Sequence, residues 1–390
     1  MMGCSVRNEE FMKEKSKVIL LPCDSYREEA VYEQLKTGIR LLGGLEAFVK
    51  KEDKILLKPN LLKRAEVEKA VITHPAVVKA VGRLLKEYGC RKVILGDSCG
   101  TGTTKKVIRG TGMDQALEEL GIPAVDFSDG KPVVYSQGIQ AREFVLPKEI
   151  RECDSIFSLC KMKTHALERI TGAVKNSYGF VYGFHKAKGH TQYPSADSFA
   201  RMLVDLNRFV RPKLYIMDGI TAMEGNGPGS GDPVSMNVLL LSADPVALDS
   251  VFCRLIGLDP RLVPTNDHGE KMGLGFWQTE RISLLTPDGP LSMEEAVKTY
   301  GKPDFKVDRS AVKNGIWEKM ARALNLFQKK PYIDKEKCIR CGICVKSCPV
   351  PQKALNFSKG KGQPPVYDYK KCIRCFCCQE MCPEKAIKVK

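Results

Sequence analysis

The stretch Cys338-Ile-Arg-Cys341-Gly-Ile-Cys344-Val-Lys-Ser-Cys348-Pro349 decides the nature of the C-terminal part of this chain, and it recurs as Cys372-Ile-Arg-Cys375-Phe-Cys-Cys378-Gln-Glu-Met-Cys382-Pro383. Both copies read C-x2-C-x2-C-x3-C-P, the spacing of bacterial ferredoxins. The first three thiolates of such a run reach corners of one 4Fe–4S cube, and the fourth cysteine points to the other cube. The sequence therefore predicts a small α+β, ferredoxin-like domain with two 4Fe–4S clusters.

The crossed pattern predicts which cysteines share a cluster. The first cluster is assigned to Cys338, Cys341, Cys344 and Cys382, and the second to Cys348, Cys372, Cys375 and Cys378. A zinc ribbon is the alternative, but it pairs two CxxC units and needs no third cysteine. Cys377 stands where the first copy has Ile343. Two roles stay open for it: a small residue beside the cluster, or a group that tunes the potential or senses redox state.

Composition indicates a soluble globular protein, because 43% of the 390 residues are hydrophobic and 28% are charged. No apolar stretch approaches the roughly 20 residues that span a bilayer, and residues 1–17 lack the apolar region of a signal peptide. Nine of the 16 cysteines crowd between Cys338 and Cys382, at metal-ligand spacing. The other seven are scattered, unlike the framework of a secreted disulfide scaffold. These features predict a cytoplasmic protein.

The net charge is +16, and residues 331–390 carry +8 of it. These lysines and arginines form no recognisable nucleic-acid-binding pattern, so we expect no nucleic-acid partner. Each oxidised cluster with four thiolates carries negative charge, which part of the excess offsets. The rest predicts a docking face for a redox partner protein with an acidic surface.

The first 330 residues alternate between strand and helix patterns. Short apolar runs predict strands at Lys17–Pro22, Lys54–Lys58, Lys92–Gly96, Ala124–Phe127, Ser155–Leu159, Lys213–Met217 and Asn237–Ser242. Helices are expected at Val31–Val49, with an end near Gly43-Gly44 or beyond it, and at Thr73–Tyr88, Gln115–Leu120 and Pro245–Ile256. This alternation is typical of an α/β domain with a mostly parallel sheet and helices on both faces.

Polar residues follow the predicted strands, and in such folds ligands bind at the carboxyl ends of the strands. The candidate catalytic residues of this crevice are Lys163, His165, Lys175 and Glu224, and the candidate binding residues are Lys58, Asn60, Asp97, Asn176 and Asp218. Taken singly, the lysines could be solvated and the aspartates could cap turns. The glycine-rich segment 225–231 matches neither the Walker nor the dinucleotide pattern.

Together these residues resemble the family known as domain of unknown function 362. The resemblance rests on Lys58-Pro-Asn60, Thr73-His-Pro75, Gly96-Asp-Ser98, Lys163-Thr-His165, Val174-Lys-Asn176, Asp218-Gly219, Glu224-Gly-Asn-Gly-Pro228 and Asp244-Pro-Val-Ala-Leu-Asp249. It covers roughly residues 17 to 260. Many members carry an appended ferredoxin module. The resemblance implies a cytoplasmic prokaryotic redox protein and supplies no substrate, because the family has no generally assigned reaction.

The predicted domains are an α/β domain over 1–312, a linker helix over 313–330 and a two-cluster ferredoxin domain over 331–390. The favoured function is an electron-transfer protein that relays electrons to a redox partner. One alternative is a cluster-dependent reductase, an iron–sulfur oxidoreductase that acts on a small anionic substrate in the crevice with His165 or Glu224 as proton carrier. A binding or maturation scaffold is the other alternative. The sequence leaves enzyme activity open.

Overall fold

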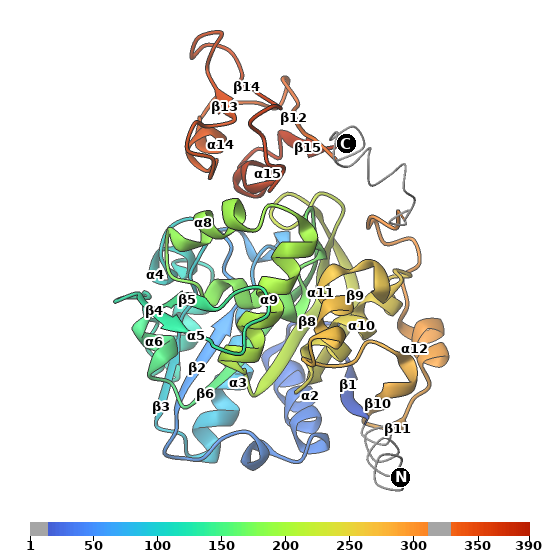
Figure 1. The fold of residues 1–390 in the computed structure, drawn as a ribbon. Coiled ribbons are helices and arrows are strands. Elements are labelled where there is room, and N and C mark those ends of the chain that lie inside the picture. Colours follow the sequence, from blue (N-terminus) through green and yellow to red (C-terminus); the bar gives the residue numbers. More distant parts are fainter. Residues whose placement is uncertain (1–14, 311–328) are drawn as a thin grey trace, which may run out of the picture.

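The computed structural model describes residues 15–310 and 329–390 (Figure 1). The predicted linker helix over 313–330 lies outside the described residues, except for its last two positions.

The body of the molecule is built on one nine-stranded sheet. Its strands are β1 (Ser16–Pro22), β2 (Lys54–Pro59), β3 (Lys92–Leu95), β6 (Ser155–His165), β7 (Arg169–Ile170), β8 (Leu214–Glu224), β9 (Asp232–Ser242), β10 (Ile282–Thr286) and β11 (Gly289–Pro290). The order is β11-β10-β1-β9-β8-β6-β2-β3, with β7 paired to β6. Strands β3, β2, β6 and β8 are mutually parallel, as are β1 and β10, and β9 runs antiparallel between β8 and β1. The predicted α/β class with a mostly parallel sheet is confirmed.

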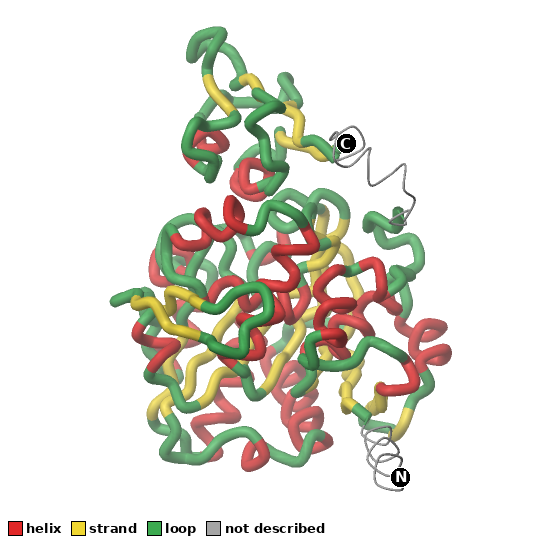
Figure 2. Tube along the Cα trace, in the orientation of Figure 1, coloured by secondary structure: helices red, strands yellow, loops and turns green. Residues whose placement is uncertain are grey.

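Helices cover both faces of this sheet (Figure 2). They are α2 (Glu28–Leu41), α3 (Pro75–Tyr88), α4 (Thr104–Ile108), α5 (Met113–Glu119), α6 (Lys148–Arg151), α7 (Gly172–Asn176), α8 (His185–Gln192), α9 (Ala196–Val210), α10 (Pro245–Leu255), α11 (Pro264–Lys271) and α12 (Met293–Tyr300). Successive strand side chains point to opposite faces. Accordingly Ile19 and Leu21 join the apolar core with α2 and α3, whereas Val18 and Leu20 join the core with α10.

One local prediction is wrong, and the predicted helix end near Gly43-Gly44 is confirmed. The segment Ala124–Phe127 is not a strand, because only Ala124 forms an isolated bridge, to Leu95. Helix α2 ends at Leu41, before Gly43 and Gly44, whose positive φ angles are incompatible with a continuing right-handed helix. The structure also adds a hairpin of β4 (Lys131–Val134) and β5 (Glu143–Leu146), which the apolar pattern did not reveal.

The C-terminal residues form a small module above one end of the sheet, with α15 as its nearest element to the body (Figure 1). The strand β12 (Pro331–Ile333) pairs with β15 (Ile387–Val389), and β13 (Leu355–Asn356) pairs with β14 (Val366–Tyr367). Each cysteine motif continues into a short helix, α14 (Ile343–Lys346) or α15 (Cys377–Met381). We call residues 329–390 the ferredoxin module.

Candidate functional site

Four cysteines of the ferredoxin module surround one cavity. The thiol of Cys344 lies near the thiols of Cys341, Cys382 and Cys338. The same four residues line a single cavity at the end of the module. Among the described residues, no three His, Cys, Asp or Glu side chains are grouped to hold a single metal ion. A donor set of four thiols around a cavity fits one 4Fe–4S cube.

The other four motif cysteines form the second group. Cys372 lies near Cys375 and Cys348, and Cys378 lies near Cys375 and Cys372. Cys348, Cys375 and Cys378 are buried. The fourth cysteine of each motif thus lies with the first three of the other motif. The ligand assignment itself stays a prediction, and this arrangement is the one it requires.

Cys377 lies at the boundary between the ferredoxin module and the α/β body. Its thiol donates a hydrogen bond to Cys375, which lowers the pKa of the Cys375 thiol. Tyr178 of the body lies near both Cys375 and Cys377. The second group of thiols therefore faces the body, at the carboxyl ends of the parallel strands.

Helix α15 is anchored to the body by side-chain contacts at the strand ends. The Nε2 of Gln379 donates to the backbone oxygens of Asn226 and Gly227, at 2.7 and 3.0 Å, and to Asn226 Oδ1 at 3.0 Å. Lys63 Nζ donates to the carbonyls of Glu380 and Cys382, at 3.0 and 3.1 Å. These contacts satisfy buried polar groups, so they define one docked arrangement of the two parts.

The glycine-rich segment 225–231 forms the surface on which α15 rests. A Cβ atom at Gly229 would lie 2.7 Å from the carbonyl oxygen of Glu380, closer than real contacts allow. Glycine is required here because the backbone of α15 approaches so closely. The close approach of α15 explains why segment 225–231 is rich in glycine although it matches no nucleotide-binding pattern.

Five of the predicted crevice residues form one buried hydrogen-bond network under α15. Lys58 Nζ lies 3.0 Å from Asp97 Oδ1 and donates to Asn176 Oδ1 at 3.0 Å. Asn60 Nδ2 donates to the same Asn176 oxygen at 2.9 Å, and Asn60 Oδ1 accepts from Lys163 Nζ at 2.8 Å. A Cβ at Gly179 would lie 2.0 Å from Asp97 Oδ1, which excludes any larger residue there.

Burial lowers the pKa of both lysines in this network. Desolvation lowers the pKa of Lys58, although Asp97 opposes the shift. It lowers the pKa of Lys163 well below the usual value, and Lys163 donates to Asn60 and to the carbonyl of Val71 at 2.7 Å. Both ammonium groups are satisfied internally, at 1% exposure. Neither group is open to solvent in this arrangement, and their role in binding an anionic substrate stays a prediction.

Asp218 lies in a neighbouring network. Its carboxylate pairs with Lys161 at 2.7 Å and accepts from the Tyr26 hydroxyl at 2.7 Å and from the backbone N–H of His74 at 2.9 Å. His74 caps α3 by accepting from Ala76 N at 3.1 Å, and its ring stacks on Tyr26 with centroids 3.5 Å apart. This part of the predicted crevice has a structural role.

The burial of His74 makes stability depend on pH. Desolvation lowers its pKa from 6.5 to about 4, so the unfolded chain binds a proton below pH 6.5 that the folded chain binds only near pH 4. The free energy of unfolding should therefore fall as pH drops from 6.5 to 4, by up to roughly 3 kcal/mol from this residue. Replacement His74→Gln keeps an acceptor for the cap, and urea unfolding followed by tryptophan fluorescence should show a shallower acid loss. An equally steep loss in the variant would contradict this assignment.

His165 connects the body with the ferredoxin module. Its Nδ1 accepts from the backbone N–H groups of Leu167 and Glu168, at 3.2 and 3.1 Å, so the proton resides on Nε2. Nε2 lies 3.0 Å from Glu380 Oε1, off the line of an ideal hydrogen bond. Burial lowers the pKa of His165 to about 4, whereas His165 and Lys175 hold the pKa of the Glu380 carboxyl below its usual value against its burial.

Lys175 and Glu168 lie beside this contact without direct partners. Lys175 is half-buried and has no ion pair or side-chain hydrogen bond within residues 15–310 and 329–390. The Glu168 carboxyl is fully buried, accepts no hydrogen bond from the described residues, and has a pKa raised well above the usual value by burial. Sequence analysis singled out Lys175 and missed Glu168, Lys63, Gln379 and Glu380, which no local motif marks.

Glu224 is held by contacts to Lys306. Its Oε2 accepts from the backbone N–H of Lys306 at 2.9 Å, and its Oε1 lies 3.1 Å from Lys306 Nζ. This end of β8 is therefore held by a surface ion pair. The side chains of Glu224 and His165 make no hydrogen bond or ion pair with each other among the described residues, and the role of Glu224 as a proton carrier stays a prediction.

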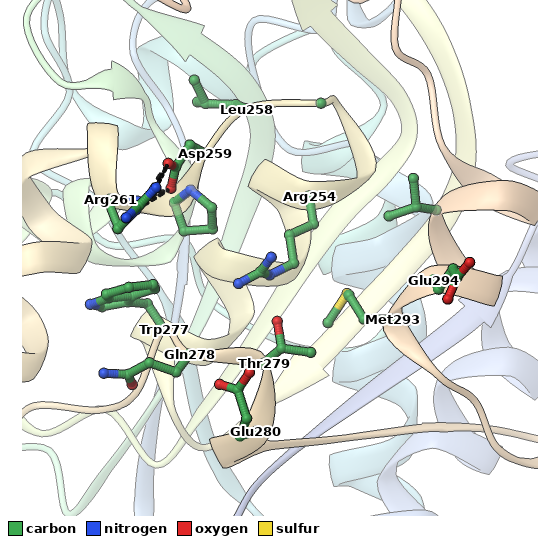
Figure 3. A pocket seen from close by; sticks show the side chains of 13 residues that line it. Arg254, Leu258, Asp259, Arg261, Trp277, Gln278, Thr279, Glu280, Met293 and Glu294 are labelled. Atoms are coloured by element: carbon green, nitrogen blue, oxygen red, sulfur yellow. Dashed lines mark hydrogen bonds and ion pairs between the residues drawn. The ribbon is translucent and has the colours of Figure 1, made fainter. Parts of the chain in front are cut away.

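A wide hollow of about 810 Å³ lies elsewhere, between the end of α10, the loop after α11 and α12 (Figure 3). Arg261 and Asp259 at its edge pair with each other at 2.6 Å. None of the candidate residues from the sequence lines it. It is therefore distinct from the strand-end site.

The class of the protein follows from these two parts. Residues 330–383 match the 4Fe-4S dicluster domain, so this is an iron–sulfur protein. Residues 55–254 match the domain of unknown function (DUF362), which covers half of the chain. The chain belongs to the DUF362 family. None of the helices in the described parts of the chain has the length and apolar character needed to cross a membrane.

Individual relatives add little beyond the family. A thylakoid-associated protein of Synechocystis sp. is 39% identical over 258 residues, which are 66% of this chain and 79% of the relative. The lactate racemase apoprotein of Thermoanaerobacterium thermosaccharolyticum aligns with 12% identity and a TM-score of 0.42, over 63% of this chain and 58% of that one. A Thermotoga maritima protein aligns with 13% identity and a TM-score of 0.36, over 65% and 60%. The chain spans about three fifths of each solved structure.

Proposed function

We propose that this protein is a two-cluster ferredoxin-type electron carrier that takes electrons from a partner protein at one end and presents them to its own α/β body at the other. The observation that carries the proposal is the seating of α15, with its second group of thiols, on the strand ends of the body. When bound, the clusters supply one-electron storage and transfer. The chain's own residues decide which end meets which partner.

The first group of thiols is the outward end. Cys341 is exposed, and its neighbour Ile339 is 60% exposed. Exposed cations, Arg340 and Lys346 among them, surround this end. A basic rim of this kind favours encounter with an acidic partner surface and suits the +8 charge of residues 331–390.

The second group of thiols is the inward end. Cys375 and Cys378 are buried, and Tyr178, His165 and Glu380 separate them from solvent on the side of the body. An apolar and hydrogen-bonded shell around thiolate ligands controls solvent access and redox potential. The residues at this boundary therefore supply a fixed path, shielded from water, for electrons to pass from the second cluster into the body.

A cluster-dependent reductase is the second candidate function, and Lys175 favours it. An ammonium group without a partner, close to His165 and Glu380, is suited to hold an anionic group of a substrate near the second cluster. In that case His165, with its proton on Nε2, would be the proton donor.

The relay is tested with anaerobically purified protein. It should contain about eight irons per chain and a broad visible absorbance that dithionite bleaches. Reduction by an acidic flavodoxin should slow at least about tenfold from low to high salt, and Arg340→Gln should slow it at low salt. Lys175→Met should leave this rate unchanged.

Other outcomes count against parts of the proposal. Zinc, or only about four irons, would contradict two clusters. A rate that does not respond to salt would contradict an acidic partner at the outward end. A slower rate in Lys175→Met would place the entry of electrons at the strand ends and contradict the outward end as the entry point.

A further inference from the structure

A groove of about 440 Å³ runs between the α/β body and the ferredoxin module, and both parts contribute to its walls. The body supplies the segment around Thr164 and His165 and the glycine-rich loop. The ferredoxin module supplies β12, β15 and the residue before Cys338. A hollow of this volume suits a small molecule. It lies outside the strand-end network of Lys58, which is closed.

The groove is basic. Its lining includes five cations, Arg169, Lys329, Lys337, Lys385 and Lys388, and two carboxylates, Asp232 and Asp308. Both carboxylates already have partners: Asp308 lies 3.6 Å from Arg169 and also pairs with Lys329, and Asp232 lies 3.4 Å from Lys385.

Two further lysines line the groove, one paired outside it and one unpaired. Lys388 pairs with Asp334, which does not line the groove, at 3.0 Å. Lys337 is exposed and has no ion pair among residues 15–310 and 329–390. An excess of positive charge therefore remains after internal pairing, and it comes from both sides of the boundary.

One buried polar group in the wall also lacks a partner. Ser230 lines the groove and is only 4% exposed, and its Oγ makes no hydrogen bond within the described parts of the chain. A buried hydroxyl without a partner destabilises the fold, so such groups usually have a water or ligand beside them. His165 also lines the groove, and its Nε2 lies 3.0 Å from Glu380 Oε1.

We propose that this inter-module groove is a binding site for a small anion with two or more negative charges on phosphate or carboxylate groups. The cations attract the charges, Ser230 donates a hydrogen bond, and the volume excludes a folded partner. The inference does not rest on the electron relay, since binding is measured on the oxidised protein without a redox partner. A bound anion would contact both parts and so favour their docked arrangement.

The test uses the oxidised full-length protein with its clusters, and pyrophosphate and citrate as separate probes in isothermal titration calorimetry. Saturable binding that weakens with salt is expected for at least one probe. The double replacement Lys337→Gln and Lys388→Gln should weaken it at least about tenfold, since it removes two charge-assisted contacts to the anion. The matched control, Lys359→Gln with Lys361→Gln, removes two exposed lysines of the same module outside the groove and should change nothing.

Ser230→Ala gives a second, uncharged variant for the case that the double lysine variant loses iron. It should weaken binding by about threefold to tenfold. Binding of pyrophosphate alone or of citrate alone supports the site and shows whether it selects phosphate or carboxylate groups. Binding of both supports a site that recognises negative charge. Absence of binding by either probe, or equal binding in the groove and control variants, would overturn the proposal.

Discussion

Replacing Cys382 by alanine is expected to remove about half of the iron, leaving about four irons per chain, because each cube holds four. Cys382 belongs to the second cysteine motif, yet its thiol lies with Cys338, Cys341 and Cys344 of the first. The cluster that is lost should therefore be the outward one. Iron and sulfide analysis gives the amount, and electron paramagnetic resonance of the reduced protein shows which signal disappears.

A double variant tests the crossed assignment of cysteines to clusters more strictly. Cys338→Ala together with Cys382→Ala should lose no more iron than either change alone, because both residues serve the same cluster. Cys377→Ala is the control and should retain about eight irons, since its thiol donates to Cys375 and is not an assigned ligand. Loss of both clusters in the double variant, with one lost in each single variant, would show that the motifs are not crossed.

The replacement Gln379→Glu should detach the ferredoxin module from the body. The side chain is fully buried, and its amide nitrogen donates to three oxygens of Asn226 and Gly227. A carboxylate of the same shape would place a negative oxygen against three acceptors and bury an uncompensated charge. The docked arrangement should lose roughly 3–5 kcal/mol.

The measurement has two parts. Small-angle X-ray scattering should show a larger radius of gyration, and hydrogen exchange should become faster in the glycine-rich segment 225–231. Iron content should stay near that of the wild type, because the altered side chain faces the body. Gln363→Glu makes the same chemical change at an exposed position of the module and should have neither effect. Unchanged scattering in Gln379→Glu would mean that this contact does not hold the two parts together.

The local sequence pattern located several strands, but it did not predict how long they are. Lys161-Met-Lys163-Thr-His165 reads as the polar loop after a strand, yet it is the second half of β6 and every residue of β6 is buried. Its polar side chains remain in the sheet because Asp218, Asn60 and Glu380 provide partners. Those partners come from other strands and from the ferredoxin module, so no window of sequence contains them.

The candidate site shows the same limit. The rule that polar residues gather at the carboxyl ends of parallel strands correctly brought Lys58, Asn60, Asp97, Lys163 and Asn176 together. It did not reveal that α15 would close the crevice over them. It also did not reveal that the Glu224 carboxylate pairs with Lys306, which lies in a loop far along the chain.

The sequence alone determined that the chain ends in two cysteine runs of ferredoxin spacing, because cluster ligation depends on how far a few consecutive residues can reach. It also determined the α/β class, because strand and helix periods are local. Only the tertiary structure decided that the second run faces the body, that Glu380 meets His165 across 215 positions of chain, and that a basic groove forms between the two parts. Such contacts depend on the complementary shape and charge of surfaces that the folded chain brings together.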